Sequence, residues 1–263
     1  MTDSTAPRAA TTPPDYFCQQ ARQLLAEATK HDISLRLMGS VAIGLRCEAF
    51  LRQFVAETRV YKDIDFAGLR GESAVIRRLF EAHGWLHHPN VELVSDGGRM
   101  AFDRRDTRLH ADVFLDEIRM CHTIDLRTRL VLDQTTLTPA DLLLSKLQRI
   151  DLREVDIEDA LCILATFGVG PGDPDTINAQ YICGLLGANW GFWRTTIDNL
   201  AKLRGFLLQL TESGPSSTAQ VQSRITQLDQ ELTAVPKTIR WKARAVLGRA
   251  FRYYNRVDDA GGF

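Results

Sequence analysis

Apolar and polar positions along the chain follow two different periods, and the change of period divides the sequence into two regions. Up to about residue 165, short runs with a period of two are separated by stretches in which apolar residues recur every three or four positions. Beyond that point the pattern is almost entirely helical. The sequence therefore predicts an α+β fold: a mixed sheet flanked by helices, followed by a helical domain.

These periods place individual elements. The predicted helices span Tyr16–Lys30, Val41–Phe54, Ser73–His83 and Leu137–Ile150, with a further helix from Val155 onward. The predicted strands span residues 35–38, 59–67, 99–103, 109–115 and 121–126, with a hairpin turn through 104–108. The glycine- and proline-rich run Gly168–Pro174 is the predicted linker. We expect a disordered tail over residues 1–14, a sheet-containing domain over 15–167 and a helical domain over 168–263.

Three aspartates lie on two of the predicted strands. Asp63 and Asp65 belong to the run Lys62–Phe66, and Asp112 belongs to a later strand. Because strand side chains alternate between faces, Asp63 and Asp65 point the same way. If the two strands are neighbours, the three carboxylates converge, and charges that close are costly unless a cation neutralises them. Such oxygen ligands suit Mg²⁺ (or Mn²⁺), which also binds substrate phosphates.

Gly39 and Ser40 follow the first strand and open a helix. Gly39 permits a tight turn and a close backbone approach, and Ser40 can cap the helix, whose first amides form a natural anion site. Taken alone, a Gly-Ser pair is most simply a turn. Its position between a strand and a helix, upstream of the paired aspartates, favours a site for the phosphates of a nucleotide.

Lys146 falls within the apolar stripe of its predicted helix, whose start carries a capping signature in Thr138 and Asp141. A lysine in a buried stripe needs a partner for its charge. Two interpretations stay open: the ammonium reaches solvent at the rim, or it is directed at a triphosphate or the aspartates. Acidic residues are favoured at the start of a helix. Asp156 and Asp159, further along, are therefore explained as a solvated acidic helix start just as well as by a functional role.

Taken together, Met38-Gly39-Ser40, Lys62-Asp63-Ile64-Asp65-Phe66 and Ala111-Asp112-Val113 resemble the signature of the DNA polymerase β-like nucleotidyltransferase superfamily. The chain is most similar to the bacterial branch that contains AbiEii-type toxins and antibiotic nucleotidyltransferases. The resemblance covers roughly residues 20–160 and implies a nucleotidyltransferase-fold sheet. One departure is that twenty-two residues (41–62) follow Ser40 before the first aspartate, which argues against the small antitoxin-type domains.

The resemblance implies an enzyme. Members of this superfamily transfer a nucleoside monophosphate from an NTP to a hydroxyl or phosphate acceptor and release pyrophosphate. Asp63 and Asp65 would bind both metals, and Asp112 would bind the catalytic metal and help to deprotonate the acceptor. Gly39 and Ser40 would hold the β- and γ-phosphates.

The same branch carries a lysine in the helix after its third acidic residue, a position that Lys146 matches. Its ammonium would neutralise charge that develops in the transition state. Asp156-x-x-Asp159 resembles the last motif of the branch. The alternative is a non-catalytic nucleic-acid or protein-binding module on the same fold, such as one half of a toxin–antitoxin pair with an antitoxin protein as its partner. Retention of all three aspartates favours catalysis.

Composition is that of an ordinary globular protein: 263 residues, 44% apolar, 25% charged, with a net charge of −1. No apolar run approaches transmembrane length, so we expect a cytoplasmic protein without a membrane partner. Five scattered cysteines without a Cys-x-x-Cys pair predict reduced thiols. His87-His88 and Cys121-His122 lack a third ligand at a compatible spacing, which argues against a zinc site.

Residues 237–256 read as a last helix with seven basic residues and no acidic one. Its apolar residues gather on one side, and we expect this side to pack against the protein, which argues against a membrane-surface role. Arg240, Arg244 and Arg252 are candidates to bind the phosphates of an RNA acceptor. The alternatives are a solvated helix face and a small-molecule acceptor bound elsewhere.

Overall fold

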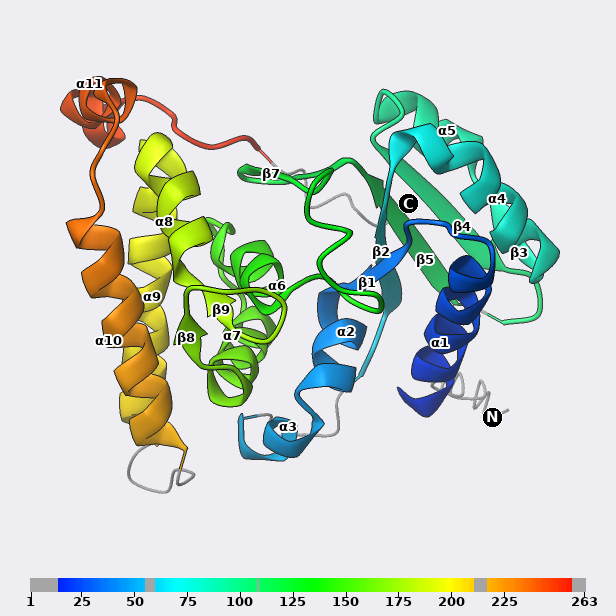
Figure 1. Cartoon of the computed structure of the whole chain (residues 1–263), viewed down its shortest axis with the longest axis horizontal. Coiled ribbons are helices and arrows are strands. Elements are labelled where there is room, and N and C mark those ends of the chain that lie inside the picture. Colours follow the sequence, from blue (N-terminus) through cyan, green and yellow to red (C-terminus); the bar gives the residue numbers. More distant parts are fainter. Residues whose placement is uncertain (1–13, 55–59, 108, 211–216, 257–263) are drawn as a thin grey trace, which may run out of the picture.

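The computed structural model describes residues 14–54, 60–107, 109–210 and 217–256. Its centre is a five-stranded mixed sheet in the order β1–β2–β5–β4–β3 (Figure 1). The central pair β2 and β5 is parallel, and the other neighbouring pairs are antiparallel. The strands are β1 (Arg36–Met38), β2 (Asp63–Gly68), β3 (Trp85–His87), β4 (Arg99–Arg104) and β5 (His110–Leu115).

Helices connect and cover these strands. They are α1 (Pro14–Lys30), α2 (Gly39–Arg46), α3 (Glu48–Phe54), α4 (Ser73–Ala82), α5 (Pro89–Val94), α6 (Pro139–Leu147) and α7 (Glu154–Thr166). A short hairpin of β6 (Glu117–Arg119) and β7 (Thr123–Asp125) follows β5. The α+β class predicted from the sequence, with a mixed sheet between helices, is confirmed.

The two faces of the sheet differ in chemistry. On one face, Phe66 of β2 packs edge-on against Phe80 of α4, and Phe80 stacks on Phe102 of β4 with ring centroids 4.3 Å apart. These rings are fully buried and form a dry aromatic core. Because side chains alternate along β2, Asp63 and Asp65 point to the opposite face, where α2, α6 and α7 lie (Figure 1).

The rest of the chain is mostly helical, as predicted. A two-stranded ladder of β8 (Val169–Gly170) and β9 (Ile177–Asn178) leads into α8 (Ala179–Ala188), α9 (Trp190–Leu210), α10 (Thr218–Ala234) and α11 (Ile239–Leu247). Leucines of α9 and aliphatic residues of α10 are buried in the same hydrophobic cluster as the sheet. The division into domains at residue 168 stays a prediction.

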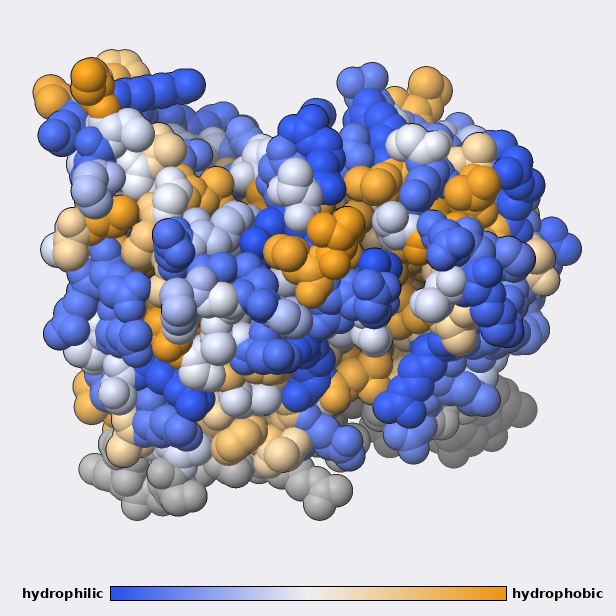
Figure 2. All heavy atoms as spheres, viewed as in Figure 1, coloured by the Kyte–Doolittle hydropathy of each residue, from blue (hydrophilic) through white to orange (hydrophobic). Residues whose placement is uncertain are grey.

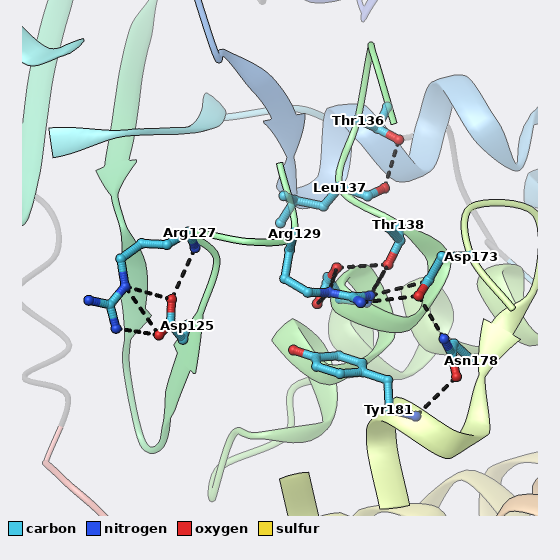
Figure 3. A network of polar contacts seen from close by, with 10 residues as sticks. Asp125, Arg127, Arg129, Thr136, Leu137, Thr138, Asp173, Asn178 and Tyr181 are labelled. Atoms are coloured by element: carbon cyan, nitrogen blue, oxygen red, sulfur yellow. Dashed lines mark hydrogen bonds and ion pairs between the residues drawn. The ribbon is translucent and has the colours of Figure 1, made fainter. Parts of the chain in front are cut away.

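The segment predicted as a linker is held by a buried polar network (Figure 3). Arg129, which precedes α6, donates to both oxygens of Asp173 at 3.1 Å and to Asp141 and Thr138. Its guanidinium lies 3.7 Å from the ring centroid of Tyr181 on α8. The network therefore ties the first turn of α6 to the start of the helical region.

Three sequence expectations need correction or lie outside the structure. The helix predicted over Val41–Phe54 breaks at Cys47 into α2 and α3. The helix predicted over 237–256 ends at Gly248, whose positive φ of 53° stops the helical path. Of the predicted tail, residues 1–13 lie outside the described part of the chain, and Pro14 begins α1.

Candidate active site

The candidate site is built on the parallel pair β2 and β5. Their register places Asp65 opposite Asp112 and Asp63 opposite His110. The condition stated from the sequence, that these two strands are neighbours, is therefore met. Directly opposed residues on adjacent strands lie on the same face, so the three carboxylates gather at one place on the sheet.

The proximity of these carboxylates changes how they ionise. Burial raises the pKa of Asp65 to about 7, and the negative charges of Asp63 and Asp112 contribute to this rise. Burial and Asp112 likewise raise the pKa of Asp63. Two neighbouring carboxyl groups with raised pKa values indicate a place where a bound cation would stabilise the ionised forms.

Asp112 differs from the other two because it already has cationic partners. Arg99 of β4 donates from Nε to Oδ1 at 2.8 Å and from its terminal nitrogen to Oδ2 at 2.5 Å. His110 Nε2 lies 3.4 Å from the same Oδ1. Although burial opposes the effect, His110 and Arg99 hold the pKa of Asp112 below its ordinary value. The third carboxylate is therefore ionised and paired inside the protein.

A chain of polar side chains extends from this pair. The hydrogen bond to Asp112 and a second one to Asp103 raise the pKa of His110 to about 9, against the effect of burial. Asp103 Oδ2 in turn lies 2.7 Å from Nε2 of His88. The histidine that follows His87 is thus part of a hydrogen-bonded series.

Gly39 stands directly against Asp65. Its φ of +67° lies in the left-handed region, and an added Cβ would come within 2.1 Å of Oδ2 of Asp65. Both the backbone conformation and the lack of space require glycine here. The close backbone approach that Gly39 permits is made to the carboxylate of Asp65 on β2, and its part in phosphate binding stays a prediction.

Ser40 does not have the predicted capping role. The residue before helix α2 is Met38, and no side chain caps the helix. The Ser40 hydroxyl instead donates to Oδ2 of Asp159 on α7 at 3.0 Å. The hydroxyl therefore links the start of α2 to α7.

Lys146 neither reaches solvent at the rim of the helix nor makes an ion pair with any of the three aspartates on β2 and β5. It is buried on α6, and its Nζ lies 2.8 Å from Asp159 and 3.4 Å from Asp156. Burial works against the charge, but Asp159 and Asp156 outweigh it and raise the pKa of Lys146, with a further contribution from Asp65. The ammonium thus lies among carboxylates of α7 on the side that faces Asp65.

The predicted cap of this helix is confirmed, because the Thr138 hydroxyl accepts a hydrogen bond from the amide of Asp141 at 3.3 Å. The cap fixes where α6 begins and therefore which face of it carries Lys146.

The carboxylate oxygens of this site are suitable ligands for a divalent cation, but their arrangement is not that of a complete metal site. Carboxylate oxygens are the ligands that Mg²⁺ and Mn²⁺ prefer, and added positive charge would relieve Asp63 and Asp65. Among the described residues, however, no three acidic, histidine or cysteine side chains surround a common point as metal ligands do. Both oxygens of Asp112 are instead bonded to Arg99. Asp63 and Asp65 would hold a cation first, and Asp112 could join them only after Arg99 turns away.

The three arginines proposed for acceptor binding have different surroundings. Arg244 donates to the carbonyls of Gly248, Phe251 and Arg252, and its guanidinium lies 4.8 Å from the Trp190 ring centroid. It therefore holds the end of α11 in place. Arg240 and Arg252 are exposed. In Figure 1, α11 lies at the left edge of the molecule, well away from β2 and β5 near its centre. The segment after α11, which includes Arg252, runs back toward the β6–β7 hairpin, where Asn255 bonds to the carbonyls of Cys121 and Met120.

Two residues of the site were missed from the sequence. His110 lies two positions before Asp112 on the same strand, so the period-two rule places both on one face. Arg99 gives no comparable signal, because its partner lies on another strand and only the register of β4 against β5 brings them together.

Comparisons with known proteins add little to this geometry. No family model and no curated protein matches the chain. Among solved structures, the chain is similar to an antigenic nucleotidyltransferase-like protein from Paracoccidioides brasiliensis, with a TM-score of 0.41 and 16% identity over 85% of this chain and 95% of the other. A match this distant carries no information about residues, substrates or activity. The AbiEii-like branch stays a prediction.

Proposed function

We propose that the protein is a Mg²⁺-dependent nucleotidyltransferase that moves a nucleoside monophosphate from an NTP to an acceptor and releases pyrophosphate. The observation that carries this proposal is that Asp63, Asp65 and Asp112 lie on one face of two adjacent strands, with Gly39 packed directly against Asp65. A divalent cation bound there would stabilise the attacking and leaving oxygens of an in-line displacement.

The residues of the chain have distinct parts in this proposal. Asp63 and Asp65 would hold the cation, and Asp112 would accept the proton of the acceptor hydroxyl. The amides that open α2 at Gly39 and Ser40 lack carbonyl partners within the helix and point to where the β- and γ-phosphates would lie.

Lys146 has a positioning part in the proposal. Because its ammonium is bonded to Asp159, which also accepts from Ser40, the lysine links α6 to the start of α2 through one carboxylate. Lys146 would thus orient the phosphate-binding turn and add positive charge beside Asp65.

The salt bridge between Arg99 and Asp112 is the one observation that favours the second candidate, a non-catalytic binding module. The bidentate pair takes up a lone pair on each oxygen of Asp112 and, against the effect of burial, helps His110 to lower its pKa, so this aspartate is less able to bind metal or to accept a proton. The two candidates therefore differ in a measurable way: a catalytic site must release Asp112 when metal and nucleotide arrive, whereas a binding module keeps the pair intact.

The test is transfer of label from each of the four α-³²P-labelled NTPs, with Mg²⁺ or Mn²⁺, to total RNA, tRNA or a set of hydroxylated small molecules. We expect labelled acceptor that depends on the metal and is lost in Asp63→Asn. Exposed Asp151→Asn, which lies outside the site, is the matched control and should keep full activity. Absence of labelled product, together with metal-independent binding of RNA or of an antitoxin protein, would support the binding module instead.

A further inference from the structure

Helix α11 presents its apolar side to solvent, contrary to the packing expected from the sequence. Ile239 is 88% exposed, Val246 87% and Leu247 48%. At 100° per residue these side chains and Ala243 form one continuous stripe. The side of the helix that faces the protein carries Trp241, whose ring packs against Trp193 with centroids 5.2 Å apart.

Basic residues border this stripe on both sides. On the helical wheel Lys242 lies at one edge and Arg240 at the other, and both are exposed. Beyond the helix, Phe251 is 62% exposed and is followed by the exposed Arg252. Residues 237–256 contain no acidic residue. The outer surface of α11 therefore combines an aliphatic centre with a cationic border (Figure 2, at the corner that α11 occupies in Figure 1).

Three other cations of this segment, Lys237, Arg244 and Arg249, have partners in the protein, which separates them from the outer surface. Lys237 donates to the carbonyl of Leu232 and lies between two tryptophan rings. Arg249 pairs with Asp198 at 2.7 Å. The protein thus uses some cations to fix α11 and leaves Arg240, Lys242 and Arg252 directed outward.

We propose that the outer surface of α11 binds a lipid bilayer that contains anionic phospholipids. The helix would lie in the plane of the interface, with the Ile239–Val246 stripe at the boundary between headgroups and acyl chains and the bordering cations on headgroup phosphates. A nine-residue helix buries little area, so the binding is weak and reversible and depends on the anionic charge of the membrane.

Charge and shape favour a bilayer over other occupants. Single-stranded RNA is bound by several cations interleaved with exposed aromatic rings. On α11 the exposed apolar residues are aliphatic and Trp241 faces inward, and the exposed ring beside a cation is Phe251, beyond the helix. A second copy of the same surface would bring like charges together without an acid between them. An anionic bilayer would bury the aliphatic stripe and also place phosphate groups next to the bordering cations.

The experiment is flotation of the full-length protein with vesicles of phosphatidylcholine alone or mixed with phosphatidylglycerol. We expect binding to the mixed vesicles only, weakened by salt. Arg240→Glu/Lys242→Glu should reduce the partition coefficient by about thirtyfold or more. Ile239→Ser/Val246→Ser should reduce it by about tenfold or more. Because all four side chains are exposed, these variants should keep the thermal unfolding midpoint of the wild type.

A matched control lies on α5, where Leu93 and Val94 are 78% and 74% exposed next to the acidic Glu92 and Asp96. Leu93→Ser/Val94→Ser should bind vesicles as the wild type does. Lack of flotation with anionic vesicles, or flotation unaffected by the serine pair on α11, would overturn the proposal. So would RNA binding that the glutamate pair abolishes and the serine pair leaves intact, or a dimer that the serine pair dissociates.

Discussion

At the scale of single residues, Asp65 connects folding to the proposed chemistry. Its pKa in the folded protein is about 7, above the ordinary value of an unfolded chain, because of burial and two neighbouring acids. Between the two pKa values the folded state holds more protons than the unfolded state, so stability falls as pH rises through this window. The group contributes no such loss below the unfolded pKa.

The first prediction follows from this sign. In the absence of divalent metal, Asp65→Asn should be more stable than the wild type at pH 8 by on the order of 1–3 kcal/mol, with a smaller gain at pH 5. Urea unfolding at the two pH values measures this, with Asp151→Asn as a control that shows no gain. Added Mg²⁺ should stabilise the wild type more than the variant. An equal gain at both pH values would contradict the coupling of these acids.

A second prediction concerns Arg99, which occupies the oxygens that Asp112 would offer to a cation. If Arg99 and metal compete for Asp112, Arg99→Gln should bind Mn²⁺ about tenfold more tightly at low ionic strength. Titration followed by electron paramagnetic resonance measures the free ion directly. The control is Arg119→Gln, which removes an exposed arginine paired with Glu117. Unchanged or weaker affinity would remove Asp112 from the ligand set.

At the scale of elements, α6 and α7 are joined by a buried charge cluster. Lys146 faces Asp159 and Asp156, which are 0% and 1% exposed, and Asp156 also pairs with Arg149 and Arg153. Asp159 lies 2.8 Å from the lysine ammonium and also accepts a hydrogen bond from the neutral hydroxyl of Ser40. A buried carboxylate that loses its cation is strongly destabilising.

The third prediction is therefore that Lys146→Met destabilises the protein by roughly 2–4 kcal/mol, and that Lys146→Met/Asp159→Asn recovers most of this loss. Denaturant unfolding of the single and double variants measures the coupling. Lys202→Met, which removes an exposed lysine of α9, is the control. If the single variant keeps full stability, the ammonium is not held by Asp159. If the recovered double variant lacks nucleotidyl transfer, the pair serves the reaction as well as the fold.

At the scale of the whole molecule, the sheet and the C-terminal helices share one hydrophobic cluster and the Arg129 network. Arg129 is 8% exposed. It bonds to Asp141 in the first turn of α6 and to Asp173 between β8 and β9, where the helical region begins. Packing and polar contacts therefore both oppose independent motion of the two regions.

The fourth prediction is that Arg129→Met lowers the free energy of unfolding by roughly 3–5 kcal/mol, because two buried carboxylates lose their cation. Unfolding should stay a single transition by circular dichroism and by tryptophan fluorescence. Arg127 lies two residues away and pairs with Asp125 at the surface (Figure 3), so Arg127→Met should hardly change stability. Two separated transitions in the wild type would show that the regions fold independently.

The sequence by itself determined most of the elements around the candidate site and the faces of their side chains, whereas β3, α5 and β6 were not predicted. Period-two alternation placed Asp63 and Asp65 on one face of a strand, and Thr138 located the start of α6, because both rules depend only on neighbours along the chain. The tight turn that Gly39 permits was also visible in the sequence, whereas the requirement for glycine and its contact with Asp65 were not.

Only the tertiary structure decided which charges meet. The pairing of Asp112 with Arg99 depends on the register of β4 against β5, and that of Lys146 with Asp159 depends on the packing of α6 against α7. The exposure of the apolar stripe of α11 likewise depends on which side Trp241 turns to the protein. Local periodicity gives the direction of a side chain relative to its own element, and long-range packing decides what that direction faces.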